Sequence, residues 1–358
     1  MKKTKGILKI LIIAISCYFL LFTFNSSAEE LGIAFEVAPK HPTTQIDRTR
    51  GYYYIETKPG EKQSVDLEIF STTDRELTLE MSVENAYSAT TGNIDYSNDL
   101  ELLHESLVNP ITEIVTFPSE IVTLKPKESK VVSFDLNPPA DHYDGVKMGR
   151  IIIKEKSDDN SKGITQEYRY ALGVITSESG LAYNDGNTLE LEKVQANINL
   201  GNKVVEGYIV NPQPKTIENL EVRSYVTKKG STKKVKERNI DNFSFAPNSR
   251  LVYTIPWGLS EFQSGEYTFH FEATNDFEKF NLVQNFVIRG EDARKLNKDA
   301  AFSVTTPNIM KIIIITLNTI LIILFVVIIA RDKKWIKEIK TKRRSRNRGS
   351  KRNRKKTE

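Results

Sequence analysis

The feature that most constrains this chain is an almost unbroken apolar run, Ile312 to Ala330, which a Lys/Arg-rich tail follows at once. The run has 19 residues and no ionisable side chain, and about 20 apolar residues in a helix cross the hydrocarbon core of a bilayer. The tail carries 15 basic and three acidic residues, a net charge of +12. Because such an excess stays in the cytoplasm during insertion, we expect a transmembrane helix at 309–330, a cytoplasmic tail at 331–358, and the rest of the chain outside the cell.

The amino terminus carries the pattern of a secretory signal. Four lysines lie within its first nine residues, an apolar stretch follows from Ile10 to Phe24, and Ser26-Ser27-Ala28 come next. A basic segment, an apolar segment and a small-residue site predict a signal peptide at 1–28, cleaved after Ala28. An uncleaved signal anchor is the alternative, although the stretch is short for a span. Cys17 is the only cysteine, so the exported chain is expected to fold without disulfides.

Charge separates sharply between the tail and the exported body. Residues 29–330 hold 32 basic and 43 acidic residues, a net charge of −11, although the whole chain is +5. A mildly acidic body is not suited to coating nucleic acid. The position of the basic tail beside a span is explained more simply by topology and by attraction to anionic lipid. We therefore expect no nucleic-acid partner.

Apolar residues recur with a period of two from Leu31 onward. Val65, Leu67 and Ile69, for example, alternate with Asp66 and Glu68. Such alternation buries one face of a strand and leaves the other in water, and no amphipathic helix is apparent in the same region. The expected strands are 65–69, 77–83, 111–116, 131–136, 148–153, 168–175, 189–191, 204–210, 220–226, 251–255, 267–273 and 286–289.

Short strands separated by turn signals favour an all-β chain of antiparallel sandwiches over any βαβ arrangement. Lys58-Pro59-Gly60-Glu61, for example, precedes an expected strand, and proline followed by glycine is typical of a turn. Alternation is lost across Ser177 to Gly186, where we place the domain boundary. We thus expect two immunoglobulin-like β-sandwich domains, at 29–180 and 181–290, and a polar juxtamembrane linker at 291–308.

Two stretches offer the chemistry of glycan binding, which needs exposed aromatic faces against the sugar's C–H surface and amides or carboxylates for its hydroxyls. In the tyrosine triplet that starts at Tyr52, neighbouring rings lie on opposite faces of a strand, so at least one ring points away from the core. The candidate glycan-binding residues are Tyr52, Tyr53, Asn85, Tyr87, Asn93, Asp95 and Tyr96. The opposing interpretation, in which these tyrosines pack at one end of a sandwich and Gly92-Asn93 only turns the chain, stays open.

Catalytic and metal-binding patterns are weak. Asp141-His142-Tyr143-Asp144 contains ligand types, yet a zinc site typically needs three protein ligands, and the other histidines are scattered without motif spacing. The exported chain has no cysteine nucleophile and no HExxH or GxSxG motif. We expect no enzyme, no metal and no cofactor, with a peptidoglycan-acting enzyme as the weaker alternative.

Several short motifs follow one another in this order: Tyr52-Tyr53, Lys58 to Gln63, Asn85-Ala86, Thr91 to Tyr96, Tyr143 to Val146, Asn211-Pro212-Gln213, Ala246 to Ser249, Gly265-Glu266-Tyr267, Ala293 and Leu296-Asn297. Together they resemble the WxL-interacting surface proteins of Gram-positive bacteria. The resemblance implies a first domain that binds peptidoglycan, a second that binds a host matrix protein, and partner proteins carrying the WxL domain. Three positions depart from the family pattern: Lys147, Arg150 and Phe280.

The leading hypothesis is a non-enzymatic adhesion or scaffold protein of the cell surface, held by one C-terminal span. Its expected partners are peptidoglycan, WxL proteins, a host extracellular matrix protein and the membrane. The alternative is a membrane-anchored signalling or assembly component. The short tail argues against signalling, because it has no room for a folded cytoplasmic domain.

Overall fold

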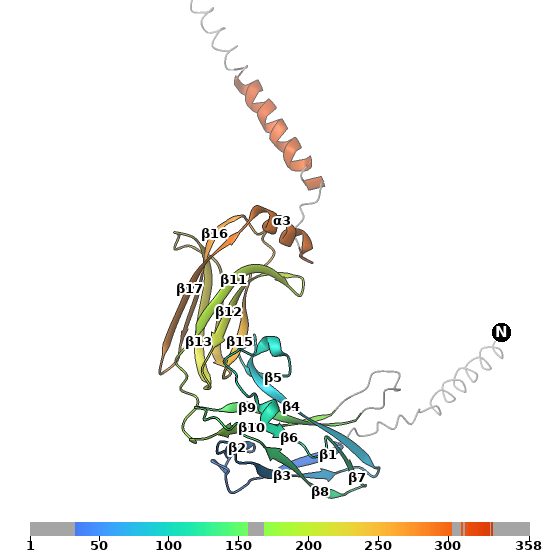
Figure 1. The fold of residues 1–358 in the computed structure, drawn as a ribbon. Coiled ribbons are helices and arrows are strands. Elements are labelled where there is room, and N and C mark those ends of the chain that lie inside the picture. Colours follow the sequence, from blue (N-terminus) through green and yellow to red (C-terminus); the bar gives the residue numbers. More distant parts are fainter. Residues whose placement is uncertain (1–32, 157–167, 303–308, 311, 330, 332–358) are drawn as a thin grey trace, which may run out of the picture.

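The computed structural model describes residues 33–156, 168–302, 309–310, 312–329 and 331 (Figure 1). The expected signal peptide and most of the basic tail lie outside these residues. The described chain forms two β-sandwiches, one after the other, then a short helix and a long apolar helix. The expected all-β, immunoglobulin-like fold class is therefore confirmed.

Two sheets form the first sandwich. One has the order β1-β3-β8-β6, with strands β1 (Phe35–Lys40), β3 (Gln63–Ser71), β8 (Ser129–Leu136) and β6 (Val115–Thr116). The other has the order β2-β10-β9-β4-β5, and β7 also pairs with β4; its strands are β2 (Tyr53–Glu56), β10 (Arg169–Ser177), β9 (Lys147–Glu155), β4 (Leu77–Ser88), β5 (Ile94–Ser97) and β7 (Ile121–Leu124). The pairing of β2 with β10 is parallel, whereas β4 and β9 pair antiparallel.

The alternating residues of the sequence become the core of this sandwich. Val65, Leu67 and Ile69 of β3 are buried together with Leu77 and Leu79 of β4. Full burial of one such side chain contributes about 1.5–3 kcal/mol. The intervening polar residues lie outside, as the period of a strand requires.

The segment 111–116 differs from the expected strand. Ile111–Ile114 form one helical turn, α2, and only β6 is extended. The Pro110 carbonyl accepts hydrogen bonds from the N–H groups of Glu113 and Ile114, at 2.9 and 3.3 Å, which starts the turn. Ile111 and Ile114 lie on one face because they are three residues apart, and both are buried. An apolar residue at each end of a short segment fits a helical turn as well as a strand.

All neighbouring strands described in the second sandwich pair antiparallel. Its three-stranded sheet has the order β11 (Glu190–Asn199), β12 (Asn202–Asn211) and β15 (Ser249–Pro256). Its four-stranded sheet has the order β14 (Lys234–Phe245), β13 (Ile217–Lys228), β16 (Gly265–Thr274) and β17 (Lys279–Ile288). Strand β16 directs the side chains of Tyr267, Phe269 and Phe271 into the core. Phe280 is buried in the same core. The departure from the family pattern at Phe280 thus keeps an aromatic core residue.

A helix follows the second sandwich where no amphipathic helix was expected. Helix α3 (Gly290–Asp299) buries Ala293 against the core. Asn297 fixes the helix, because its side chain accepts from the Phe262 N–H at 2.8 Å and donates to the Phe262 carbonyl at 3.0 Å. Part of the expected polar linker is therefore an integral element of the second sandwich. The segment is mostly polar and its apolar face is only a few residues long, so the sequence pattern did not indicate a helix.

Hydrogen bonds join the two sandwiches through the turn between β4 and β5. The Ser88 and Ser249 hydroxyls lie 2.6 Å apart and are buried. The Gly92 carbonyl accepts from the Ser244 N–H at 2.7 Å, and Gly92 lies against the Phe243 ring so closely that a side chain there would collide with it. The turn is thus docked on the second sandwich.

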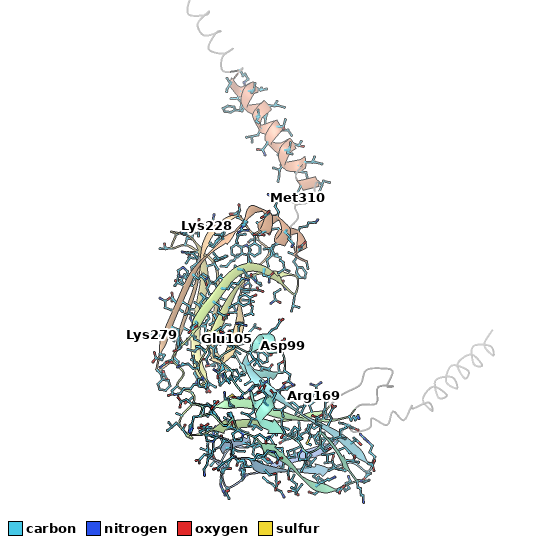
Figure 2. The ribbon with its side chains drawn as sticks, in the orientation of Figure 1. Asp99, Glu105, Arg169, Lys228, Lys279 and Met310 are labelled. Carbon is cyan, nitrogen blue, oxygen red and sulfur yellow. The ribbon has the colours of Figure 1, made fainter. Side chains whose placement is uncertain are left out.

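Two further contacts hold the junction. The Val146 N–H donates to the Pro214 carbonyl at 2.9 Å. The His104 Nε2 lies 3.5 Å from the Glu192 carboxylate, and the neighbouring residue Glu105 lies beside the second sandwich in Figure 2. Because backbone groups and buried hydroxyls are satisfied across this boundary, the sandwiches form a fixed, bent pair (Figure 1).

The last described helix is the apolar run. Ile312–Ile329 has a mean hydropathy of 3.2 and is not buried against the rest of the protein. It is long and apolar enough to cross a membrane. The end of the second sandwich that carries Lys228 and α3 lies toward this helix (Figure 2).

Candidate functional site

The tyrosine triplet divides between two faces of one sheet. Tyr53 is fully buried in the first core, and its hydroxyl donates to the Asp66 carbonyl at 2.6 Å. Tyr52 and Tyr54 lie on the opposite, outer face, where Tyr52 sits over Gly173 of β10. Burial removes Tyr53 from the candidate ligand-binding residues, and Tyr52 remains.

Tyr52 lines a hollow of about 400 Å³ at the junction of the two sandwiches, here called the tyrosine hollow. Tyr54 and Tyr183 form its aromatic wall, with ring centroids 5.4 Å apart in an edge-to-face arrangement. The Tyr54 hydroxyl donates to the Leu181 carbonyl at 3.0 Å and so fixes the segment that carries Tyr183. The full lining is Arg50, Tyr52, Tyr54, Gly180, Leu181, Ala182, Tyr183, Asn184 and Glu218.

Charged groups surround the rings of the hollow. The Arg50 guanidinium lies 5.8 Å from the centre of the Tyr52 ring and pairs with Asp47 at 2.9 Å. Hydrogen bonds from Thr49, and then from Arg50, hold the pKa of the Asp47 carboxyl at about 2. Burial, and then the hydrogen bond with Tyr52, raises the pKa of Tyr183. The hollow therefore combines tyrosine rings with the Arg50 guanidinium and the Glu218 side chain.

Tyr96 lies on the same outer face as Tyr52. The strand register sets Gly173 opposite Arg150, and Arg150 opposite Glu84. The Arg150 guanidinium covers the Tyr96 ring at 4.9 Å and pairs with Glu84 at 2.7 Å. Arg150, one of the departures from the family pattern, is thus held as a cation over Tyr96 on the outer face.

The other predicted residues are not brought to this face. Asn85 is buried and bonds to the Thr112 hydroxyl at 3.1 Å. Tyr87 points away from Tyr96 because the two stand at alternating positions of the β4–β5 ladder, and it reaches Asp95 at 3.4 Å. Asn93 is exposed in the turn that docks on the second sandwich. For this turn, the interpretation as packing at a sandwich end fits the geometry better.

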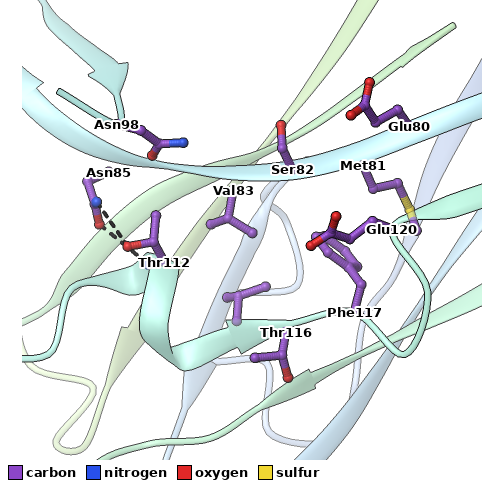
Figure 3. Close-up of a pocket in the computed structure, with 11 residues that line it drawn as sticks. Glu80, Met81, Ser82, Val83, Asn85, Asn98, Thr112, Thr116, Phe117 and Glu120 are labelled. Carbon is purple, nitrogen blue, oxygen red and sulfur yellow. Dashed lines mark hydrogen bonds between the residues drawn. The ribbon is translucent and has the colours of Figure 1, made fainter. Parts of the chain in front are cut away.

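A second pocket, of about 540 Å³, lies on the side of the first sandwich between β4 and the α2–β6 segment (Figure 3). Asn85 closes one end of it through Thr112. Lys147, the other departure in the first domain, lies near that side: it is buried and donates to the Val108 carbonyl. Burial lowers the pKa of the Lys147 ammonium. We call the second pocket the edge pocket.

Sequence reasoning missed Tyr183, Arg50 and Glu218. Tyr183 lies in the segment without alternating apolar residues, and that pattern predicts a domain boundary, not a binding site. The signal that could have identified it is an aromatic residue within a Gly/Asn-rich loop. His142, which suggested a metal, pairs with Glu178 at 2.8 Å. Within the ranges that the structure describes, no group of three or more His, Cys, Asp or Glu side chains is placed to hold a metal ion.

Two joined sandwiches, an aromatic hollow with polar groups, and an apolar C-terminal helix define a cell-surface binding protein anchored at a membrane. The chain belongs to the WxL Interacting Protein family. The model of its peptidoglycan binding domain matches residues 35–155, and that of its host binding domain matches residues 159–298. The resemblance stated from the sequence motifs is confirmed. The second match begins before β10, although β10 pairs within the first sandwich.

The solved structures to which the chain is similar include chaperones. The YadV chaperone is 13% identical, with 72% of this chain and 100% of that chain covered and a TM-score of 0.29. The E. coli chaperone DraB is 14% identical, with coverage of 71% and 98% and a TM-score of 0.27. At such scores the likeness supports no statement about function. No curated protein matches the chain.

Proposed function

We propose that this protein is a non-enzymatic adhesin or scaffold of the cell surface that binds the glycan of peptidoglycan in the tyrosine hollow. The observation that carries the proposal is the hollow itself, with Tyr52 and Tyr183 beside Arg50 and Glu218. Aromatic rings suit the C–H face of a sugar, and the charged groups suit its hydroxyl and amide groups. The match to a peptidoglycan binding domain covers residues 35–155, which include Tyr52.

The second sandwich takes a host matrix protein in this proposal, and a WxL protein binds the same chain. The match to a host binding domain supports the first assignment. Two sites held on one bent, anchored chain increase each other's effective concentration. The basic tail sets the orientation, with both sandwiches outside and the tail in the cytoplasm. Under the competing assembly or signalling function, the tail would be needed for activity as well as for retention.

The test is cosedimentation of the full-length protein, in detergent, with purified peptidoglycan sacculi. We expect saturable binding that soluble muropeptides compete away. Absence of saturable binding contradicts the proposal. Release of soluble muropeptides during the incubation contradicts its non-enzymatic part.

A further inference from the structure

Strand β4 has a gap along one edge. On that edge β7 pairs with residues 77–80 of β4, and β5 pairs with residues 85–88. Glu120 lies opposite Met81 and accepts a hydrogen bond from its N–H, so the residues that neither ladder reaches are Ser82 to Glu84. At about 3.3 Å per residue, this stretch offers about 10 Å of strand edge. Its sequence, Ser-Val-Glu, contains neither the lysine nor the proline that usually protects an edge.

Backbone groups of β4 point into this gap. The Met81 N–H points to the β7 side, because it donates to the Glu120 carbonyl at 2.7 Å. Backbone groups two residues apart on a strand point to the same side. The N–H and C=O of Val83 therefore face the gap, beyond the end of either ladder. They are available to pair with an added strand.

The edge pocket lies along this gap. Val83 and Phe117 are only partly buried and form its apolar floor (Figure 3). The buried Val115 also lines the pocket. Above the floor, the side chains of Glu80 and Glu120 stand at the rim (Figure 3). The pocket therefore combines an open main-chain edge, an apolar floor and an acidic rim.

The acidic rim is only partly neutralised. The Glu80 carboxylate lies 3.7 Å from the Lys154 ammonium, whereas no ion pair of the Glu120 carboxylate is found among the described residues. A residue added opposite Ser82 would turn its side chain to the face that carries Glu80. A basic side chain complements that face, whereas an acidic one is repelled.

We propose that the β4 gap binds an extended segment of a partner protein, which adds as a short strand beside Ser82–Glu84. Its inward side chains are apolar and contact Val83 and Phe117. Its outward side chains include a Lys or Arg that pairs with Glu80 or Glu120. Main-chain hydrogen bonds supply affinity and the alternating side chains supply specificity, as in other cases of strand addition.

A peptide fits the edge pocket better than a sugar does. Strand addition uses the aligned N–H and C=O of Val83, which a pyranose ring cannot match in register. The apolar lining includes Val83, Val115 and a partly buried Phe117, and it lacks the several tyrosine rings that line the tyrosine hollow. The inference is independent of the proposed glycan site, since the two pockets share no residue.

The test uses a fluorescein-labelled synthetic peptide, Thr-Val-Lys-Val-Thr, and the full-length protein in detergent. We expect anisotropy to show saturable binding below about 1 mM. Methylation of the two valine nitrogens should weaken binding about tenfold or more, because it removes main-chain donors. Replacement of the peptide lysine by glutamate should weaken it similarly, because like charges then meet.

Two protein variants complete the test. E80K/E120K reverses the rim charges and should weaken binding of the lysine peptide about tenfold. E36K/E56K makes the same change of charge at exposed residues of β1 and β2 and should leave binding unchanged. Lack of saturation near 1 mM, equal binding of the methylated peptide, or displacement by a soluble muropeptide overturns the proposal. The methylated probe on the unaltered protein decides the matter even if E80K/E120K does not fold.

Discussion

Replacement of Gly149 by alanine is expected to destabilise the first sandwich by about 3 kcal/mol, at the upper end of the range for overpacked cores. A Cβ at this position would lie 2.3 Å from the Glu84 carbonyl and 2.2 Å from a methyl carbon of Ile111. The Ile111 side chain could turn aside. The Glu84 carbonyl cannot, because it belongs to the neighbouring strand β4, which pairs with β9 at this point.

The measurement is thermal unfolding followed by far-UV circular dichroism. For a domain of this size, about 3 kcal/mol corresponds to a fall of roughly 6–12 °C in the unfolding midpoint. Gly51→Ala is the control, since nothing lies within 4 Å of a Cβ at that position. Equal midpoints for the two variants would show that β9 and α2 do not pack as closely as described.

Gly145→Ala is expected to loosen the junction between the sandwiches. Gly145 has φ of +68°, which a side chain disfavours, and its Cβ would lie 2.1 Å from the Pro214 carbonyl oxygen. That oxygen accepts the hydrogen bond from the Val146 N–H. Relief of the collision therefore breaks a contact between the two sandwiches, and the angle between them should vary more widely.

Electron–electron distance measurements would detect this change. Spin labels at cysteines replacing Glu36 and Lys279, with Cys17 replaced by serine, report on the two sandwiches separately. We expect a broader distance distribution in Gly145→Ala. Gly60→Ala is the matched control, because Gly60 has φ of +66° but its Cβ would meet nothing closer than 3.9 Å. A distribution as narrow as that of the control contradicts a junction fixed by Pro214.

The period of two was sufficient to predict most strands and both cores. Val65, Leu67 and Ile69 are buried as that pattern requires. It failed at Ile111–Ile114, where two apolar residues three apart suit a helical turn as well. It failed again at α3, because a single buried alanine and one amide-to-backbone contact leave little trace in a polar segment.

Only the part of the candidate site that depends on neighbouring residues in the sequence could be predicted. The triplet at Tyr52 required one ring on the outer face, and Tyr52 lies there. The partners of that ring come from Tyr183 and Glu218, which are far along the chain and meet Tyr52 only because the sandwiches are joined. Asn85 and Asn93 belong instead to the edge pocket and to the junction. Sequence spacing carries no information on contacts between residues that are far apart in the chain.

The measurement that tests the central claim most directly is the affinity of a Y52L/Y183L variant for purified sacculi. Leucine keeps much of the apolar volume but removes the flat ring faces. Loss of two aromatic contacts at about 0.5–1.5 kcal/mol each predicts a fall in affinity of roughly tenfold.

Y225L serves as the control, since Tyr225 stacks on His270 of the second sandwich, outside the hollow. We predict that Y225L binds sacculi as the unaltered protein does, while Y52L/Y183L binds roughly tenfold more weakly with an unchanged circular dichroism spectrum. Retention of full affinity by a folded Y52L/Y183L variant would contradict the assignment of peptidoglycan binding to the tyrosine hollow.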